Sequence, residues 1–121
     1  MSNSIHRFFD AWGLEDAAAR ADAIADALSA QARYADPRSG GVLEGPDAIA
    51  DYVGMFNANA PGWRAEVVKS DEISGVHRVT VAFGGKGPDG TEMVQHGQYF
   101  AELDDGRITR LIGFVGTGEP E

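Results

Sequence analysis

The feature of this sequence that most constrains its fold is a change in hydrophobic period near residue 63. Before it, apolar residues recur every three or four positions, and after it they alternate with polar residues. The first pattern is typical of amphipathic helices and the second of half-buried strands. Helices that precede a series of strands predict an α+β domain, with the helices packed on one side of an antiparallel sheet.

Three helices are expected in the first half. Ser2, Asn3 and Ser4 offer capping oxygens to the first. Its apolar stripe has helical spacing: Ile5, Phe8, Phe9 and Trp12. A second, alanine-rich helix is capped by Asp16 and reaches Leu28. A third begins at Pro46 and ends before Pro61.

Four strands are expected in the second half, at residues 63–73, 76–83, 91–103 and 107–116. A Gly/Pro/Asp loop at 84–90 and a tight turn at "DDG" separate the last three. Alternation assigns one face of each strand to the interior. These inward residues are predicted to be Val79, Val81 and Phe83, then Val94, His96, Gln98 and Phe100, then Thr109, Leu111, Gly113 and Val115.

Length and charge restrict the classes of partner. The chain has 121 residues, which predicts one domain over 1–121, and its 43% of apolar residues predicts a folded core. A formal charge of −9 repels phosphate backbones and anionic lipid surfaces, so we expect neither nucleic acid nor membrane as a partner. No apolar run approaches the roughly 18 residues of a spanning helix.

Cysteine and histidine usage bears on location and metals. The chain has no cysteine, and its start does not resemble a secretion signal, so we expect a cytoplasmic protein. The three histidines lack the spacing of a zinc site. We therefore expect no metal and no cofactor.

Asp36, in "RYADPRSGG", is the first candidate functional residue. Asp before Pro is common in turns, where the carboxylate caps a nearby N–H. The alternative is a general base at the mouth of a pocket. Tyr34 is either a phenol beside it or a half-buried strand residue, and Arg38 either pairs with it or stays solvated.

His96 and Gln98 form the second candidate, because they interrupt a strand face that otherwise carries Val94 and Phe100. Buried polar groups need partners or a cavity. Either they bond to neighbours or to water, or they line a pocket, where His96 donates to a carbonyl or carries a proton.

Three segments, "RYADP", "GPDAIADYVGMF" and the two strands joined by "LDDGRI", resemble the nuclear transport factor 2-like superfamily in order and spacing. The resemblance is to its SnoaL-like and ketosteroid isomerase-like branch. It implies a cone-shaped curved sheet wrapped around three N-terminal helices. The fold hosts several chemistries as well as non-catalytic proteins.

The resemblance to ketosteroid isomerases implies that Asp36 is the general base, opposite an oxyanion hole. The hole does not carry over, because Phe8 and Gln98 stand at its two donor positions. SnoaL-like cyclases place a Gln and a His on the long strand, here reversed as His96 and Gln98, and a catalytic aspartate where this chain has Gly116.

Together these features predict a pocket for a small apolar carbonyl compound, polyketide-like or terpenoid-like, with Asp36, His96 and Gln98 as catalytic residues of a cofactor-free isomerase, cyclase or dehydratase. The expected lining is aromatic and aliphatic: Phe8, Trp12, Tyr34, Tyr52, Phe56, Val79, Val81, Phe83, Phe100, Leu111, Gly113 and Val115. A non-catalytic carrier or sensor and a protein-interaction module remain alternatives. The resemblance also implies a homodimer that buries the outer face of the sheet.

Overall fold

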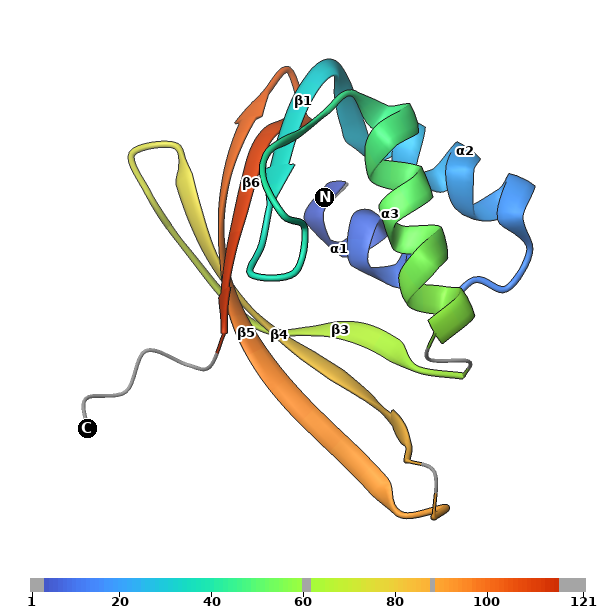
Figure 1. Cartoon of the computed structure of the whole chain (residues 1–121). Helices are drawn as coiled ribbons and strands as arrows, with labels where there is room; N and C mark the ends of the chain where they lie inside the picture. The colour runs from blue at the N-terminus through green and yellow to red at the C-terminus, as the bar shows by residue number, and fades with distance from the viewer. Residues whose placement is uncertain (1–3, 60–61, 88, 116–121) are drawn as a thin grey trace.

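The computed structural model describes residues 4–59, 62–87 and 89–115 (Figure 1). The helices are α1 (Ser4–Ala11), α2 (Ala17–Ala27) and α3 (Pro46–Asn59). The strands are β1 (Leu28–Ala35), β2 (Leu43–Glu44), β3 (Arg64–Ile73), β4 (Val76–Lys86), β5 (Glu92–Asp104) and β6 (Arg107–Val115). The three predicted helices and the curved sheet of an α+β fold are confirmed.

The six strands form one sheet in the order β2-β1-β6-β5-β4-β3. All neighbours are antiparallel except β1 and β6, which run parallel. The expectation of three helices followed by a purely antiparallel meander is therefore wrong in two respects, since β1 runs parallel to β6 and since β1 and β2 precede α3. The chain turns from helix to strand at Leu28 without an intervening Gly or Pro that would signal the change, and β1 pairs with the distant strand β6.

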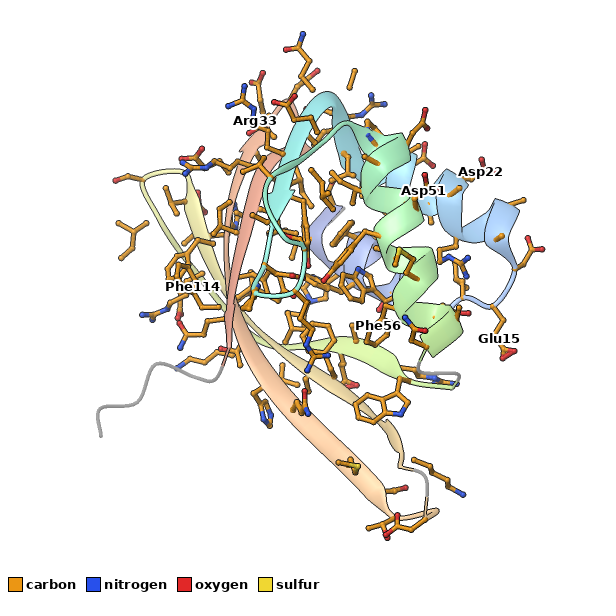
Figure 2. The ribbon with its side chains drawn as sticks, in the orientation of Figure 1. Glu15, Asp22, Arg33, Asp51, Phe56 and Phe114 are labelled. Atoms are coloured by element: carbon orange, nitrogen blue, oxygen red, sulfur yellow. The ribbon has the colours of Figure 1, made fainter. Side chains whose placement is uncertain are left out.

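The helices all lie on one side of the sheet, and β4 and β5 curve beyond them (Figure 1). The sheet stays unclosed, with β2 and β3 at its edges. Asp22 on α2 and Asp51 on α3 are exposed and point away from the sheet (Figure 2). The helices thus cover the concave face with apolar residues and turn acidic ones outward, consistent with the formal charge of −9.

The core fills the space between α1 and the sheet. Ile5, Phe8 and Phe9 are fully buried there, as their helical spacing predicts. Val79 and Val81 of β4 meet them from the sheet, as expected. Ser4 begins α1 and donates a hydrogen bond to the carbonyl of Gly106, in the β5–β6 turn. The proposed caps Ser2 and Asn3 lie outside the described residues.

Several local predictions are confirmed. The carboxylate of Asp16 accepts a hydrogen bond of 2.8 Å from the backbone N–H of Ala19, which caps α2. Asp105 and Gly106 both have positive φ, as the tight turn between β5 and β6 requires. The predicted 84–90 loop is shorter than expected, because Gly84, Gly85 and Lys86 continue β4.

The last strand departs from simple alternation. The β5–β6 register shifts between Glu102 and Leu103, so that Ile108 and Leu111 both turn inward and are fully buried. Thr109 was expected inside, but it is only partly buried, and its hydroxyl donates to the carbonyl of Glu102. A β-bulge adds one residue to the count, which strict period-two reasoning cannot anticipate.

None of the helices in the described part of the chain is long and apolar enough to cross a membrane.

Candidate functional site

A cavity of about 460 Å³ opens between the helices and the concave face of the sheet. Its lining comes from five separate parts of the chain, the segment after α1, the loop after β1, α3, the strand pair β4–β5 and the end of β6: Trp12, Asp36, Pro37, Arg38, Tyr52, Phe56, Phe83, Gln95, His96, Gly97, Tyr99 and Phe114. Most of this lining is aromatic, and a few polar groups converge on it. That composition is typical of sites for small organic molecules.

Asp36 lies directly after β1, both in a turn and in the wall of the cavity. Its Oδ1 accepts a hydrogen bond of 2.8 Å from the backbone N–H of Arg38, and its own N–H donates to Ser39 Oγ at 3.1 Å. These contacts are those of a turn residue. The same carboxylate lies in the wall of the cavity. The turn therefore holds the carboxylate in place without removing it from the site.

Two phenols donate to this carboxylate. The hydroxyl of Tyr34, on β1, lies 2.5 Å from Asp36 Oδ2. The hydroxyl of Tyr52, on α3, lies 2.8 Å from Oδ1 and 2.9 Å from Oδ2. Tyr99, on β5, lies 3.2 Å from Tyr34 between the hydroxyl oxygens. All three tyrosines of the chain thus form one cluster around Asp36, called the tyrosine cluster below.

The phenols of the tyrosine cluster stay protonated because their pKa values are raised. Burial, followed by the nearby Tyr99 and the carboxylate of Asp36, raises the pKa of Tyr34 well above its ordinary value. Burial, with the hydrogen bond to Asp36, raises the pKa of Tyr52 as well, and burial is the main cause of the raised pKa of Tyr99. Every member of the cluster is therefore a neutral hydroxyl over the physiological pH range.

Aromatic rings close the rest of the site. The ring of Trp12 lies 4.9 Å from that of Phe56 and 5.4 Å from that of Phe83, centroid to centroid. Its indole N–H is buried and has no hydrogen-bond partner within the part of the chain that the structure describes. Rings in these tilted and edge-on arrangements pack favourably. They form the aromatic part of the cavity wall that also contains Asp36.

A second cavity, of about 410 Å³, adjoins the first. The two share a boundary of five residues, Arg38, Tyr52, Phe56, Phe83 and Gln95. The second cavity reaches Met55 and Asn59 at the end of α3 and Trp63 at the start of β3. Phe56 is thus one of the side chains that belong to the walls of both cavities.

Several residues that the sequence predicted for the site do line the cavity. Asp36, Trp12, Tyr52, Phe56 and Phe83 all line it. Figure 2 shows Phe56 on the helix side of the sheet, directed into the interior. The helical spacing of the first and third helices and the alternation along β4 were sufficient to identify the four aromatic residues, and Asp36 was identified from its place before Pro37.

The face expected to be interior on β5 is wrong by one residue. Gly97, Tyr99 and Ala101 are buried, whereas Phe100 is 38% exposed. The inner face therefore carries Gln95, Gly97, Tyr99 and Ala101, and the outer face carries His96, Gln98 and Phe100. His96 borders the cavity, but alternation assigns its side chain to the outer face. Apolar residues stand on both faces of this strand, so its pattern does not reveal which face turns inward.

Other expected lining residues lie elsewhere. The core takes up Phe8, Val79, Val81 and Leu111, which are fully buried. Tyr34 lies behind Asp36, and Gly113 lies under the ring of Tyr99, where an added Cβ would stand 2.4 Å from Cε2. The side chain of Val115 and the whole of Gly116 fall outside the described residues.

Sequence reasoning missed Pro37, Gln95, Gly97 and Tyr99 at the cavity. Phe114 borders the cavity as His96 does, but it pairs with Gln98 and its side chain lies on the outer face (Figure 2). One signal could have identified Tyr99: it alternates with Gly97 and Ala101, and small residues mark the face on which a curved sheet approaches its helices.

In the part of the chain that is described, no three His, Asp or Glu side chains gather as they would around a metal ion.

The chain was compared with family models, curated proteins and solved structures. The family model described as "SnoaL-like domain" matches residues 5–111. No curated protein matches the chain. A proposed isomerase of the SnoaL-like family from Agrobacterium tumefaciens is 25% identical, with a TM-score of 0.79 over 94% of this chain and 95% of that one.

Two further structures share the fold at lower identity. A protein with a ketosteroid isomerase-like fold from Catenulispora acidiphila, in complex with trimethylamine, is 14% identical (TM-score 0.78; 93% of this chain, 85% of that one). An NTF2-like protein of unknown function from Exiguobacterium is 22% identical (TM-score 0.75; 97% and 100%). The resemblance to nuclear transport factor 2-like proteins is thereby confirmed.

Proposed function

Because this chain belongs to the SnoaL-like domain family, we propose that it binds a small, largely apolar carbonyl compound in the cavity beside Asp36 and transfers a proton on it without a cofactor. The reaction class is that of an isomerase, cyclase or dehydratase. The likeness to the proposed isomerase from Agrobacterium tumefaciens supports this class. The cytoplasmic location expected from the sequence stays a prediction.

One observation carries the proposal: a carboxylate held by a turn lies in the wall of a mainly aromatic cavity of about 460 Å³. This volume lies within the range of about 300–1,000 Å³ usual for small-molecule sites. A carboxylate that lines such a cavity lies within reach of a proton on a bound molecule. A carboxylate that served the turn alone would have no need of such a cavity.

Asp36 retains room for a substrate proton. Three N–H and O–H groups donate to its two oxygens, and Tyr52 shares a single proton between both. A carboxylate offers about four acceptor positions, and these contacts occupy two on each oxygen. Because Tyr52 has only one proton, its donation to one oxygen alone frees a position on the other for a substrate proton. The base would take the proton α to the carbonyl, the C–H electron pair would become the C=C bond of an enolate, and the carbonyl oxygen would gain the negative charge.

The enolate oxygen needs donors, and two side chains of the cavity wall can supply them in this proposal. Arg38 and Gln95 line it, and their guanidinium and amide groups are hydrogen-bond donors. In this proposal they take the role that the sequence suggested for His96 and Gln98, whose side chains belong to the outer face. Return of the proton to another carbon completes an isomerisation, loss of a β-hydroxyl a dehydration, and attack on a second carbonyl a cyclisation.

Binding is testable with the chain's own reporters. Trp12 lines the first cavity and Trp63 the second, and these are the only tryptophans in the sequence. In a Trp63→Phe variant, a carbonyl compound that enters the first cavity should change the emission of Trp12 and raise the melting temperature. If a panel of aromatic and alicyclic ketones changes neither, the pocket proposal fails and the interaction module gains ground.

We also propose the homodimer, through the outer face of the sheet. A shallow cavity there is lined by Val76, Phe100, Ile112 and Phe114, with Glu102 and Arg110 beside them. The rings of Phe100 and Phe114 meet edge-on at 5.8 Å, and Phe114 is 56% exposed on the side away from the helices (Figure 2). Exposed aromatic residues ringed by charges are typical of interfaces.

A further inference from the structure

The hydrogen bonds of the tyrosine cluster have a direction, and that direction bears on the ligand. We propose that the Asp36 carboxylate orients the cluster so that Tyr52 and Tyr99 face the cavity as hydrogen-bond acceptors, and that the ligand therefore presents a hydroxyl group to them. This inference rests on the proposed function and specifies its substrate class: an alcohol, enol or phenol that also carries the carbonyl.

The argument begins with the single proton of Tyr34. A carboxylate can only accept hydrogen bonds, so at 2.5 Å from Asp36 Oδ2 the Tyr34 hydroxyl must donate. Its only proton is then used. The 3.2 Å contact between the hydroxyls of Tyr34 and Tyr99 can therefore form only if Tyr99 donates and Tyr34 accepts.

The same count applies to the two phenols that line the cavity. Tyr99 gives its proton to Tyr34, and Tyr52 gives its proton to Asp36. Each oxygen keeps only lone pairs, so toward the cavity both can only accept. The raised pKa values of all three phenols support this arrangement, because no member loses its proton at physiological pH and leaves the chain without a donor.

The arrangement discriminates between ligands. A ligand hydroxyl beside Tyr99 or Tyr52 satisfies a lone pair, whereas a carbonyl or ether oxygen in that place meets another acceptor and leaves both without a partner. A site built around a hydroxyl rejects analogues that lack it. The donors of the cavity, Arg38 and Gln95, are the groups that can receive the ligand carbonyl. The ligand class that fits is thus a hydroxy-carbonyl compound.

Tyr34 is the positioning residue in this scheme. It is 1% exposed and does not line the cavity, so it acts on the ligand only through its two hydrogen-bond partners, Tyr99 and Asp36. Replacing it by Phe keeps the ring and removes the oxygen that accepts the Tyr99 proton. Tyr99 is then free to donate into the cavity. The preference for hydroxyl ligands should fall, although no group that touches the ligand has been changed.

The test uses two probes that differ only at the hydroxyl, 6-fluoro-2-naphthol and its methyl ether, titrated by ¹⁹F NMR. The wild-type protein should bind the naphthol about tenfold more tightly than the ether. In Tyr34→Phe this ratio should fall to near one, chiefly through tighter binding of the ether. Thr80→Val removes a hydroxyl from β4, away from the cavity, and should keep the wild-type ratio.

Each outcome has a separate meaning. Equal affinity of both probes for the wild-type protein, or an unchanged ratio in Tyr34→Phe, overturns the inference and leaves the pocket intact. Binding of neither probe contradicts the proposed function itself. Should Tyr34→Phe not fold, as judged by its melting temperature, Asp36→Asn serves instead: its amide donates as well as accepts, so it should also bring the ratio close to one.

Discussion

The hydroxyl of Tyr52 lies within 2.9 Å of both carboxylate oxygens of Asp36, although the two residues are 16 positions apart. This contact joins α3 to the loop after β1. It places the carboxylate against the cavity wall and uses a phenol that would otherwise need another partner. The position of the proposed base therefore depends on a helix as much as on its own turn.

Asp36→Asn should abolish proton transfer while binding a ketone that lacks a hydroxyl at least as tightly as the wild-type protein does. An amide has the same shape as the carboxylate but is not a base, and loss of a general base typically costs about 100- to 10,000-fold in rate. The measurement is exchange of the ketone's α-protons for deuterium, followed by NMR. Equal exchange rates in variant and wild-type protein would show that Asp36 is not the base, as expected for a carrier.

Alkaline titration should reveal the tyrosine cluster directly, because the protein has no other tyrosines. The raised pKa values predict little phenolate absorbance at 295 nm near pH 10, where the unfolded chain in guanidinium titrates. The folded pKa values exceed the unfolded ones. The stability that they contribute is therefore complete below about pH 10 and is lost as the pH rises further. Tyrosines that titrate alike in both states would contradict the buried cluster.

Gly113→Ala should disturb the cluster from beneath. The new Cβ would stand 2.4 Å from Tyr99 Cε2, so the ring must move, at a cost of about 1–3 kcal/mol in the free energy of unfolding. Gly85→Ala is a matched control, because its Cβ would meet the ring of Trp63 at the same 2.4 Å. Both variants should lose stability in urea, but only Gly113→Ala should lower the pH at which phenolate appears. A shift in both would mean that the clash acts globally.

The outer-face dimer predicts a particular response to charge. Phe114→Glu would place a carboxylate in the apolar patch and should shift the mass measured by light scattering from dimer to monomer. Val42→Glu makes the same change at a residue 58% exposed in the loop before β2 and should leave the dimer intact. If the wild-type protein is already a monomer at micromolar concentration, the dimer proposal is wrong.

The local elements of this protein could be predicted because their causes lie in short stretches of sequence. The stripe of α1, the cap at Asp16 and the turn at Asp105–Gly106 each depend on a few neighbouring residues. The family resemblance rests on the same kind of short segment, and the match over residues 5–111 agrees with it. Asp36 was identified in this way, from its place before Pro37.

Other features depend on contacts between distant parts of the chain. Strand β1 forms because β6 offers a parallel partner, and its own sequence carries no strand signal strong enough to end α2. On β5 both faces are partly apolar, so only the packing of Tyr99 over Gly113 determines which face turns inward. The bulge near Thr109 likewise depends on its pairing with β5.

The tyrosine cluster is the clearest example of a feature that could not be predicted from the sequence. The three tyrosines and Asp36 can be read from the sequence. Tyr34 and Tyr99, however, are 65 residues apart and meet only when the sheet curves around the helices. Periodicity determines which residues a helix or strand buries, since burial follows from local geometry. Which buried hydroxyl donates to which depends on distances of a few ångströms across the fold, and those distances are set by tertiary packing alone.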